Sequence, residues 1–88
     1  MEESIFLKDV AFKLNNISWD ILEMLNKNEK LSYGDIKEKL GISQNKVSKE
    51  IARLEGALLI DSKRDEVDSR IYNFRLTEHG LTILRLKK

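Results

Sequence analysis

Five polar side chains recur between residues 44 and 53 at spacings that an α-helix places on one side: Asn45, Lys46, Ser48, Lys49 and Arg53. All five can donate hydrogen bonds and three carry positive charge, so together they can contact phosphate oxygens and the edges of bases. Apolar residues follow a helical stripe on the opposite side: Val47, Ile51, Leu54 and Leu58. This pattern predicts an amphipathic helix over residues 44–55, called here the recognition helix.

A tight turn precedes this helix at residues 40–43, with the sequence Leu-Gly-Ile-Ser. Gly41 can adopt the left-handed conformation that ends a helix, and Ser43 can cap the next one. Residues 33–40 are predicted to form the helix before the turn. Two short helices joined in this way form a helix-turn-helix, whose second helix can enter the major groove of DNA.

One device occurs four times and predicts where helices begin. An apolar residue precedes a Ser or Thr, and a second apolar residue follows four positions after the hydroxyl, as in an N-cap with a hydrophobic staple. The four hydroxyl residues are Ser18, Ser32, Ser43 and Thr77. Asp35, three residues after Ser32, could complete a capping box. The device predicts helices that start just after each hydroxyl.

The remaining elements follow from periodicity. Helices are expected at residues 4–15 and 19–27, strands at 58–60 and 70–76, a charged loop at 62–69, and a last helix from 77 to 88. Helix, helix-turn-helix and a hairpin with a charged tip are the order of a winged helix. The predicted fold is mainly α with a small β-hairpin (α+β). It is one domain over residues 1–88, with a core at 17–76.

Residues 19–81 resemble the winged helix-turn-helix of bacterial and archaeal regulators of the MarR and ArsR kind. The matching stretches are Leu31-Ser32-Tyr33-Gly34-Asp35-Ile36, Ile42-Ser43, Val47-Ser48-Lys49, Arg53-Leu54-Glu55, Asp68-Ser69-Arg70 and Leu76-Thr77-Glu78-His79-Gly80. The last two are similar to the MarR wing, in which Asp-x-Arg precedes Leu-Thr-Glu-x-Gly. Two departures are that Leu58 stands at an expected glycine position and that the segments outside the core are short.

The resemblance implies that Arg70 reaches a minor groove or a phosphate, and that Asp68 orients it. Alternate residues of a strand share a face, so the carboxylate could hold the guanidinium directly. The resemblance also implies phosphate contacts near two helix starts, from Ser32, Tyr33, Ser43 and Lys46. The wing, defined as residues 61–70, adds Lys63 and Arg64 as expected DNA contacts. The recognition helix adds Gln44 to the five residues above.

The distribution of charge along the chain supports DNA contacts in the recognition helix and the wing. Residues 1–42 hold 6 Lys or Arg and 8 Asp or Glu, whereas residues 43–88 hold 10 and 7, so the positive excess lies in the half with the recognition helix.

The chain has no cysteine and one histidine, so no metal site and no cofactor are expected. No catalytic constellation stands at a useful spacing, so an enzyme is not expected. No apolar run is long enough to span a membrane, and a cytoplasmic protein is expected.

The two ends, residues 1–16 and 77–88, carry more apolar side chains than a small core needs, which is typical of a partner surface. We expect them to form a homodimer through Ile5, Phe6, Val10, Phe12, Leu14, Leu81 and Leu84. A two-fold dimer suits DNA with inverted repeats. The sequence therefore predicts a homodimeric regulator of transcription, acting as a repressor. Two alternatives stay open: a protein-interaction module of a transcription assembly, and a DNA-binding factor in replication or plasmid maintenance.

Overall fold

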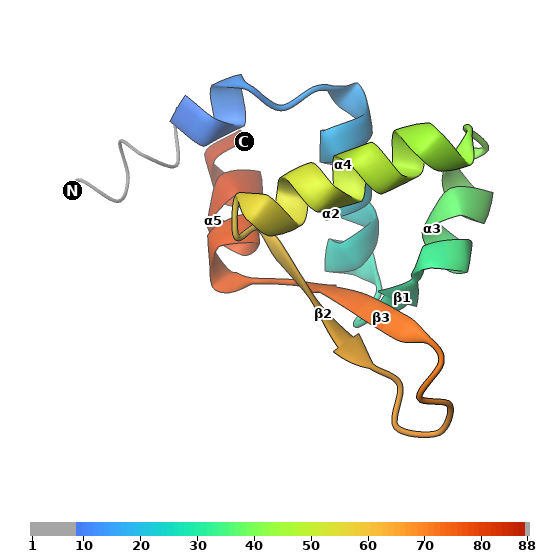
Figure 1. Cartoon of the computed structure of the whole chain (residues 1–88). Coiled ribbons are helices and arrows are strands. Elements are labelled where there is room, and N and C mark those ends of the chain that lie inside the picture. The colour runs from blue at the N-terminus through green and yellow to red at the C-terminus, as the bar shows by residue number, and fades with distance from the viewer. Residues whose placement is uncertain (1–8, 88) are drawn as a thin grey trace.

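The computed structural model describes residues 9–87, and its helices lie together above a small sheet whose β2–β3 hairpin projects away from them (Figure 1). A helical turn at residues 9–12 comes first. The elements after it are α2 (Asn16–Lys27), β1 (Leu31–Ser32), α3 (Tyr33–Leu40), α4 (Gln44–Gly56), β2 (Ile60–Arg64), β3 (Tyr72–Leu76) and α5 (Glu78–Lys87). The predicted fold class is confirmed: the chain is rich in helix and carries a small antiparallel sheet.

Three of the four predicted helix caps are present. Ser32 Oγ accepts a hydrogen bond from the backbone N–H of Asp35, and the Asp35 carboxylate accepts one from the backbone N–H of Ser32, both at 3.1 Å. This is the reciprocal capping box that the sequence suggested. Ser43 caps α4 by accepting a hydrogen bond from the backbone N–H of Lys46, and Thr77 caps α5 by accepting one from that of Gly80.

The predicted start of α2 is wrong by three residues. Asn15 is the N-cap, and its side chain accepts a hydrogen bond from the backbone N–H of Ser18 at 2.9 Å. Asparagine caps as well as serine does, so the earlier residue starts the helix. Ser18 is instead the third helical residue, and its side chain is buried. The predicted helix at residues 4–15 ends at residue 12 in the described part of the chain, and residues 4–8 lie outside that part.

The sheet has three antiparallel strands in the order β1-β3-β2. Leu31 pairs with Phe74, which joins the start of α3 to the hairpin. The strand β1 was not predicted, because two residues are too short to show an alternating pattern.

The hairpin strands are displaced from their predicted positions. The strand β2 covers Ile60–Arg64 rather than residues 58–60, and β3 begins at Tyr72 rather than Arg70. Arg64 pairs with Tyr72 at the far end of the ladder. Lys63 and Arg64 therefore lie in a strand, and residues 68–70 lie in the turn that follows it.

The end of α4 explains the shift of β2. The backbone N–H of Leu59 donates to Leu54 O and that of Leu58 donates to Glu55 O, both at 3.0 Å. This is the Schellman arrangement, which requires a left-handed residue after the helix. Leu58 takes that conformation with φ of 65° and is 61% exposed. The prediction that Leu58 extends the apolar stripe is therefore wrong, whereas Val47, Ile51 and Leu54 are buried as expected.

One core holds these elements together, with fully buried side chains from each layer: Ile21, Leu22, Ile36, Val47, Leu54, Leu59, Ile60 and Ile83. The helix α5 approaches this core closely at Gly80. A Cβ there would lie 2.2 Å from Leu59 O, so only glycine fits.

The apolar residues expected at a dimer interface have different environments. Val10 and Leu14 pack against the core, and Leu84 is only 3% exposed within its own chain. Leu81 is half-buried, whereas Phe12 is 93% exposed. Ile5 and Phe6 lie outside the described residues. Figure 1 shows both ends of the described chain on the side opposite the projecting hairpin.

Candidate nucleic-acid interface

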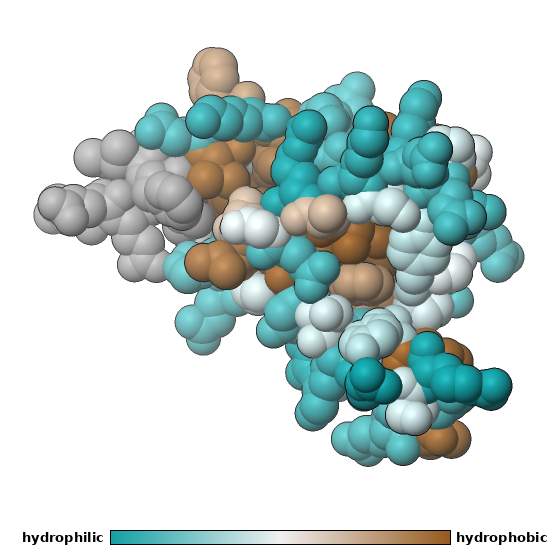
Figure 2. All heavy atoms as spheres, viewed as in Figure 1, coloured by the Kyte–Doolittle hydropathy of each residue, from teal (hydrophilic) through white to brown (hydrophobic). Residues whose placement is uncertain are grey.

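The exposed face of α4 is mostly polar, and in Figure 2 teal spheres cover much of this helix, with paler spheres toward its end. Asn45 and Lys49 lie one helical turn apart and opposite the buried Val47, Ile51 and Leu54. Among residues 9–87, neither side chain has a hydrogen bond or ion pair. The first half of the recognition helix therefore presents an amide and an ammonium group directly to solvent, on the side opposite the core.

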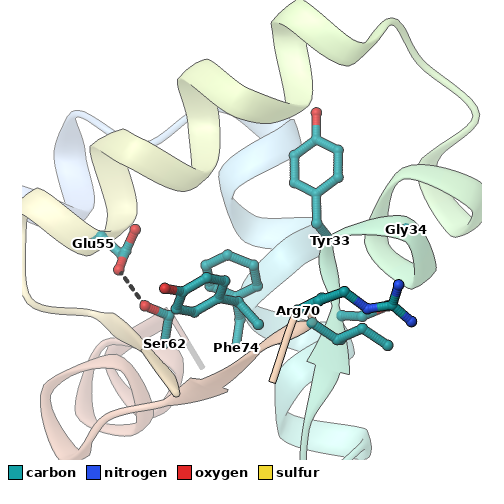
Figure 3. A pocket seen from close by; sticks show the side chains of 9 residues that line it. Tyr33, Gly34, Glu55, Ser62, Arg70 and Phe74 are labelled. Carbon is teal, nitrogen blue, oxygen red and sulfur yellow. Dashed lines mark hydrogen bonds between the residues drawn. The ribbon is translucent and has the colours of Figure 1, made fainter. Parts of the chain in front are cut away.

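One edge of α4 is joined to α3 through Tyr33, which points from the start of α3 toward α4 (Figure 3). The Tyr33 hydroxyl donates a hydrogen bond to the backbone carbonyl of Gln44 at 2.9 Å and lies 2.9 Å from Ser48 Oγ. Tyr33, predicted to contact phosphate, and Ser48, predicted to contact a base, are thus in contact with each other. Both stay partly exposed.

The other edge of α4 carries Arg53, which faces the N-terminal segment. Its guanidinium lies 3.7 Å from the carboxylate of Glu50, and its side chain borders a groove of about 460 Å³ together with Val10, Lys13 and Leu14. Arg53 is thus the predicted contact of the recognition helix that pairs with Glu50 and borders the N-terminal segment.

Glu50 was not among the predicted site residues, although it ties the recognition helix to α2. It is 6% exposed, and its carboxylate accepts hydrogen bonds from Ser18 Oγ at 2.5 Å and from Asn15 Nδ2 at 3.2 Å. With Arg53 as a third partner, the buried charge is satisfied. Its position three residues after Val47 and four before Leu54 places it on the buried face, and that spacing was the available signal.

The tip of the wing is built around two aspartates. Asp68 accepts hydrogen bonds from Arg70 Nε and Nη2, both at 3.1 Å, and from the backbone N–H of Arg70 at 3.0 Å. The predicted contact between these side chains is present, but the expected reason is wrong. Residues 68–70 form a turn, in which the Asp carboxylate reaches the backbone two residues ahead. The Arg70 guanidinium keeps the pKa of Asp68 below its ordinary value.

Asp65 organises the same turn and was also missed by the sequence reasoning. Its carboxylate accepts hydrogen bonds from the backbone N–H groups of Val67 and Asp68 and from Asn73 Nδ2, at 3.1, 3.0 and 2.9 Å. These bonds, led by the one from Asp68, lower the pKa of Asp65. Lys30 lies 3.8 Å away, so the wing is also attached to the segment before β1.

The two other basic residues of the wing differ from each other. Arg64 donates a hydrogen bond to Ser69 O at 3.0 Å, and its guanidinium carbon lies 5.0 Å from the centre of the Tyr72 ring. Such cation–π contact holds a guanidinium against an aromatic face. Lys63 is exposed on β2. Arg64 is exposed as well, but its contacts connect β2 to the turn and to β3.

A groove of about 610 Å³ separates the start of α3, the end of α4 and the hairpin (Figure 3). Glu55 at the end of α4 accepts a hydrogen bond from Ser62 Oγ on β2 at 3.1 Å. This bond connects α4 to β2 along one side of the groove. Arg70 and Tyr33 border it from the wing and from α3. Ile71, the residue after the wing, also lines this groove and is exposed, as is Val67 in the turn of the wing.

The structure thus links the elements that carry the predicted residues: Tyr33 joins α3 to α4, and Glu55 joins α4 to the hairpin. No helix within residues 9–87 has the length and apolar character needed to cross a membrane. In the same range, no three His, Cys, Asp or Glu side chains are grouped so that they could hold a metal ion.

Comparison with known proteins places this geometry in context. The family model of the MarR family matches residues 12–71. The structure is similar to the adhesin competence repressor AdcR from Streptococcus pyogenes, with a TM-score of 0.76 and 35% identity over 81% of this chain and 51% of that one. Comparison with curated proteins gave no significant match.

Two further solved structures are similar. The PcaV transcriptional regulator from Streptomyces coelicolor has a TM-score of 0.78 and 26% identity over 83% of this chain and 52% of that chain. ZitR, a zinc-responsive MarR family member from Lactococcus lactis, has a TM-score of 0.76 and 30% identity over 83% and 50%. The chain therefore spans about half the length of these structures.

Proposed function

The chain belongs to the MarR family, and we propose that it is a homodimeric regulator of transcription that binds double-stranded DNA with sequence specificity. In this proposal α4 enters the major groove and the wing contacts the minor groove or the backbone. Binding would occlude a promoter, so the protein acts as a repressor. The name of the similar AdcR, a repressor, supports this direction.

The observation that carries the proposal is the contrast along α4. Side chains at the edges of its polar face are engaged by Tyr33 and by Glu50, whereas Asn45 and Lys49 in the middle of that face are exposed and, among the described residues, have no hydrogen bond or ion pair. Asn can bind adenine through two hydrogen bonds and Lys can bind guanine, so these two side chains suit base contacts. Arg70, Ser32 and Ser43 are proposed to position the duplex through its phosphates or minor groove.

Selection of bound sequences from a random pool of DNA duplexes tests the proposal. We expect one enriched motif, and Asn45→Ala or Lys49→Ala should weaken binding to it by about 1–3 kcal/mol and relax preference at one position. Lys27→Ala, which removes a lysine from the far end of α2, is the matched control and should leave the motif unchanged. Failure to enrich any sequence would favour the protein-interaction alternative.

The homodimer is proposed from the apolar surface that remains at the ends of the described chain. Phe12 is exposed in the N-terminal segment, and on α5 Leu86 is exposed and Leu81 is half-buried. An exposed apolar patch is typical of a partner surface. Light scattering at micromolar concentration should give about twice the chain mass. A mass that stays at one chain across a wide concentration range would contradict the dimer.

A further inference from the structure

The hydroxyl of Tyr33 lies 2.9 Å from two oxygens of α4, the backbone carbonyl of Gln44 and the side-chain Oγ of Ser48. A phenol has one proton, and a carbonyl can only accept. The Tyr33 proton therefore goes to Gln44 O. The second contact can then be a hydrogen bond only if Ser48 donates its own proton to Tyr33 Oη.

Because Ser48 donates its proton to Tyr33, its hydroxyl can act toward a further partner only as a hydrogen-bond acceptor. Its single proton is used toward Tyr33, so the exposed side of Ser48 Oγ offers lone pairs alone. A serine without such a neighbour can turn its hydroxyl and serve as donor or acceptor, and for this reason serine contacts to DNA bases carry little discrimination. Tyr33 removes that freedom.

We propose that Tyr33 determines base specificity by fixing Ser48 as a hydrogen-bond acceptor. The inference rests on the proposed function, since it requires α4 to lie in the major groove. Adenine and cytosine present amino donors in that groove, whereas guanine and thymine present acceptors at the corresponding atoms. Ser48 should therefore select adenine or cytosine at the base that it faces. Phosphate oxygens are acceptors too, so Ser48 is directed to a base edge rather than to the backbone.

The test compares motifs selected from a random duplex pool by the parent protein, Tyr33→Phe and Ser48→Ala. The parent should enrich adenine or cytosine at one position, and Ser48→Ala should lose that preference. Tyr33→Phe keeps the ring and frees the Ser48 proton, so the same position should become indifferent or shift to guanine or thymine. The double variant should match Ser48→Ala, because Tyr33 acts through Ser48 alone at that position.

A probe on the DNA side tests the same contact without any change to Tyr33. Replacing the selected base by an analogue that lacks its exocyclic amino group should weaken binding of the parent by about three- to tenfold, the range of one neutral hydrogen bond. Ser48→Ala should bind both duplexes equally. Thr82→Val, which removes a hydroxyl that donates to Glu78 O within α5, is the matched control and should behave as the parent does.

The outcomes separate the inference from the function on which it rests. An unchanged motif for Tyr33→Phe, with a changed motif for Ser48→Ala, would overturn the role of Tyr33 while leaving DNA reading by α4 intact. A motif unchanged by Ser48→Ala would overturn the inference as well. If the parent itself enriches no sequence, the proposed function fails and this inference fails with it. Thermal unfolding of each variant verifies that the compared proteins are folded.

Discussion

Arg70 donates two parallel hydrogen bonds to the carboxylate of Asp68, from Nε to Oδ1 and from Nη2 to Oδ2, both at 3.1 Å. The Arg70 side chain is nevertheless 88% exposed, so the rest of its fork of N–H groups points to solvent. Holding a long side chain in one direction before binding lowers the entropy lost when it engages a partner. The pair therefore presents a preoriented cation at the tip of the wing.

Arg70→Ala should weaken DNA binding and reduce the dependence on salt by roughly one counterion, because it removes one positive contact. Asp68→Ala should show a milder loss, since Arg70 remains but is no longer oriented. A preference for A·T-rich flanks, where a narrow minor groove attracts arginine, should decrease in both variants. Titration at several salt concentrations measures these effects.

Glu66→Ala is the control for the charge of Asp68. Glu66 is exposed in the same turn, so its removal deletes a negative charge near DNA without releasing Arg70. Charge alone predicts that both acid-to-alanine changes tighten binding. We expect tightening for Glu66→Ala only, and tighter binding by Asp68→Ala would disprove the orienting role.

The turn of the wing should loosen on the acid side of the pH range. Both Asp65 and Asp68 have a lowered pKa in the folded protein, so their ionised forms stabilise the turn above the ordinary aspartate pKa of about 3.9. That contribution is lost as the pH falls through the lowered values. The amide signals of Val67 and Asp68 in NMR spectra should shift in this window, while those of α2 serve as the internal reference. In Asp65→Asn the dependence of the Val67 signal should be largely removed, whereas the Asp68 signal should keep the part that comes from its own carboxylate.

The carboxylate of Glu50 should matter for stability. Glu50→Ala leaves the Ser18 hydroxyl and the Asn15 amide without their acceptor and should lower the free energy of unfolding by about 2–3 kcal/mol. Glu50→Gln keeps the size and one acceptor oxygen, so its loss should be smaller. Glu55→Ala, in which a more exposed carboxylate is removed from the same helix, is the matched control. Urea unfolding measures all three, and equal losses at residues 50 and 55 would argue against a special role for the buried cluster.

Leu58→Gly should stabilise the protein, which is unusual for a change that removes a side chain. Leu58 holds φ of 65° at the position after α4 where glycine is preferred, and relief of that conformation is worth about 0.5–1 kcal/mol after the entropy of glycine is included. Leu58→Ala keeps the Cβ and hence the strain, so it should not stabilise. Thermal unfolding compares the two. A destabilised glycine variant would show that the exposed leucine contributes contacts that outweigh its backbone cost.

Local rules predicted much of this fold. Ser32, Ser43 and Thr77 cap helices as expected, because a cap depends only on residues within one turn of itself. The boundaries of β2 and β3 were harder, since strand ends depend on pairing between residues far apart in sequence. Leu58 illustrates the difficulty: its apolar type fits the helix stripe, yet the Schellman bonds at Leu54 and Glu55 end the helix before it.

The candidate site was predictable in type but not in its internal contacts. Helical spacing identified Asn45 and Lys49 on the polar face, and the resemblance to the MarR wing identified the Asp68–Arg70 pair. The contacts of Tyr33 with Ser48 and of Glu50 with Ser18 join residues 15 and 32 positions apart. Such partners become visible only once the helices are packed against each other.

The pairing of β1 with β3 has a consequence for how a duplex can be engaged. Because Leu31 is hydrogen-bonded in one sheet with Phe74, the start of α3 and the base of the hairpin form a single rigid frame. The distance between Ser32 and the wing is then set by the fold of the protein. A duplex whose groove width differs from that distance has to deform to fit, and the energy of that deformation depends on base pairs that no side chain touches.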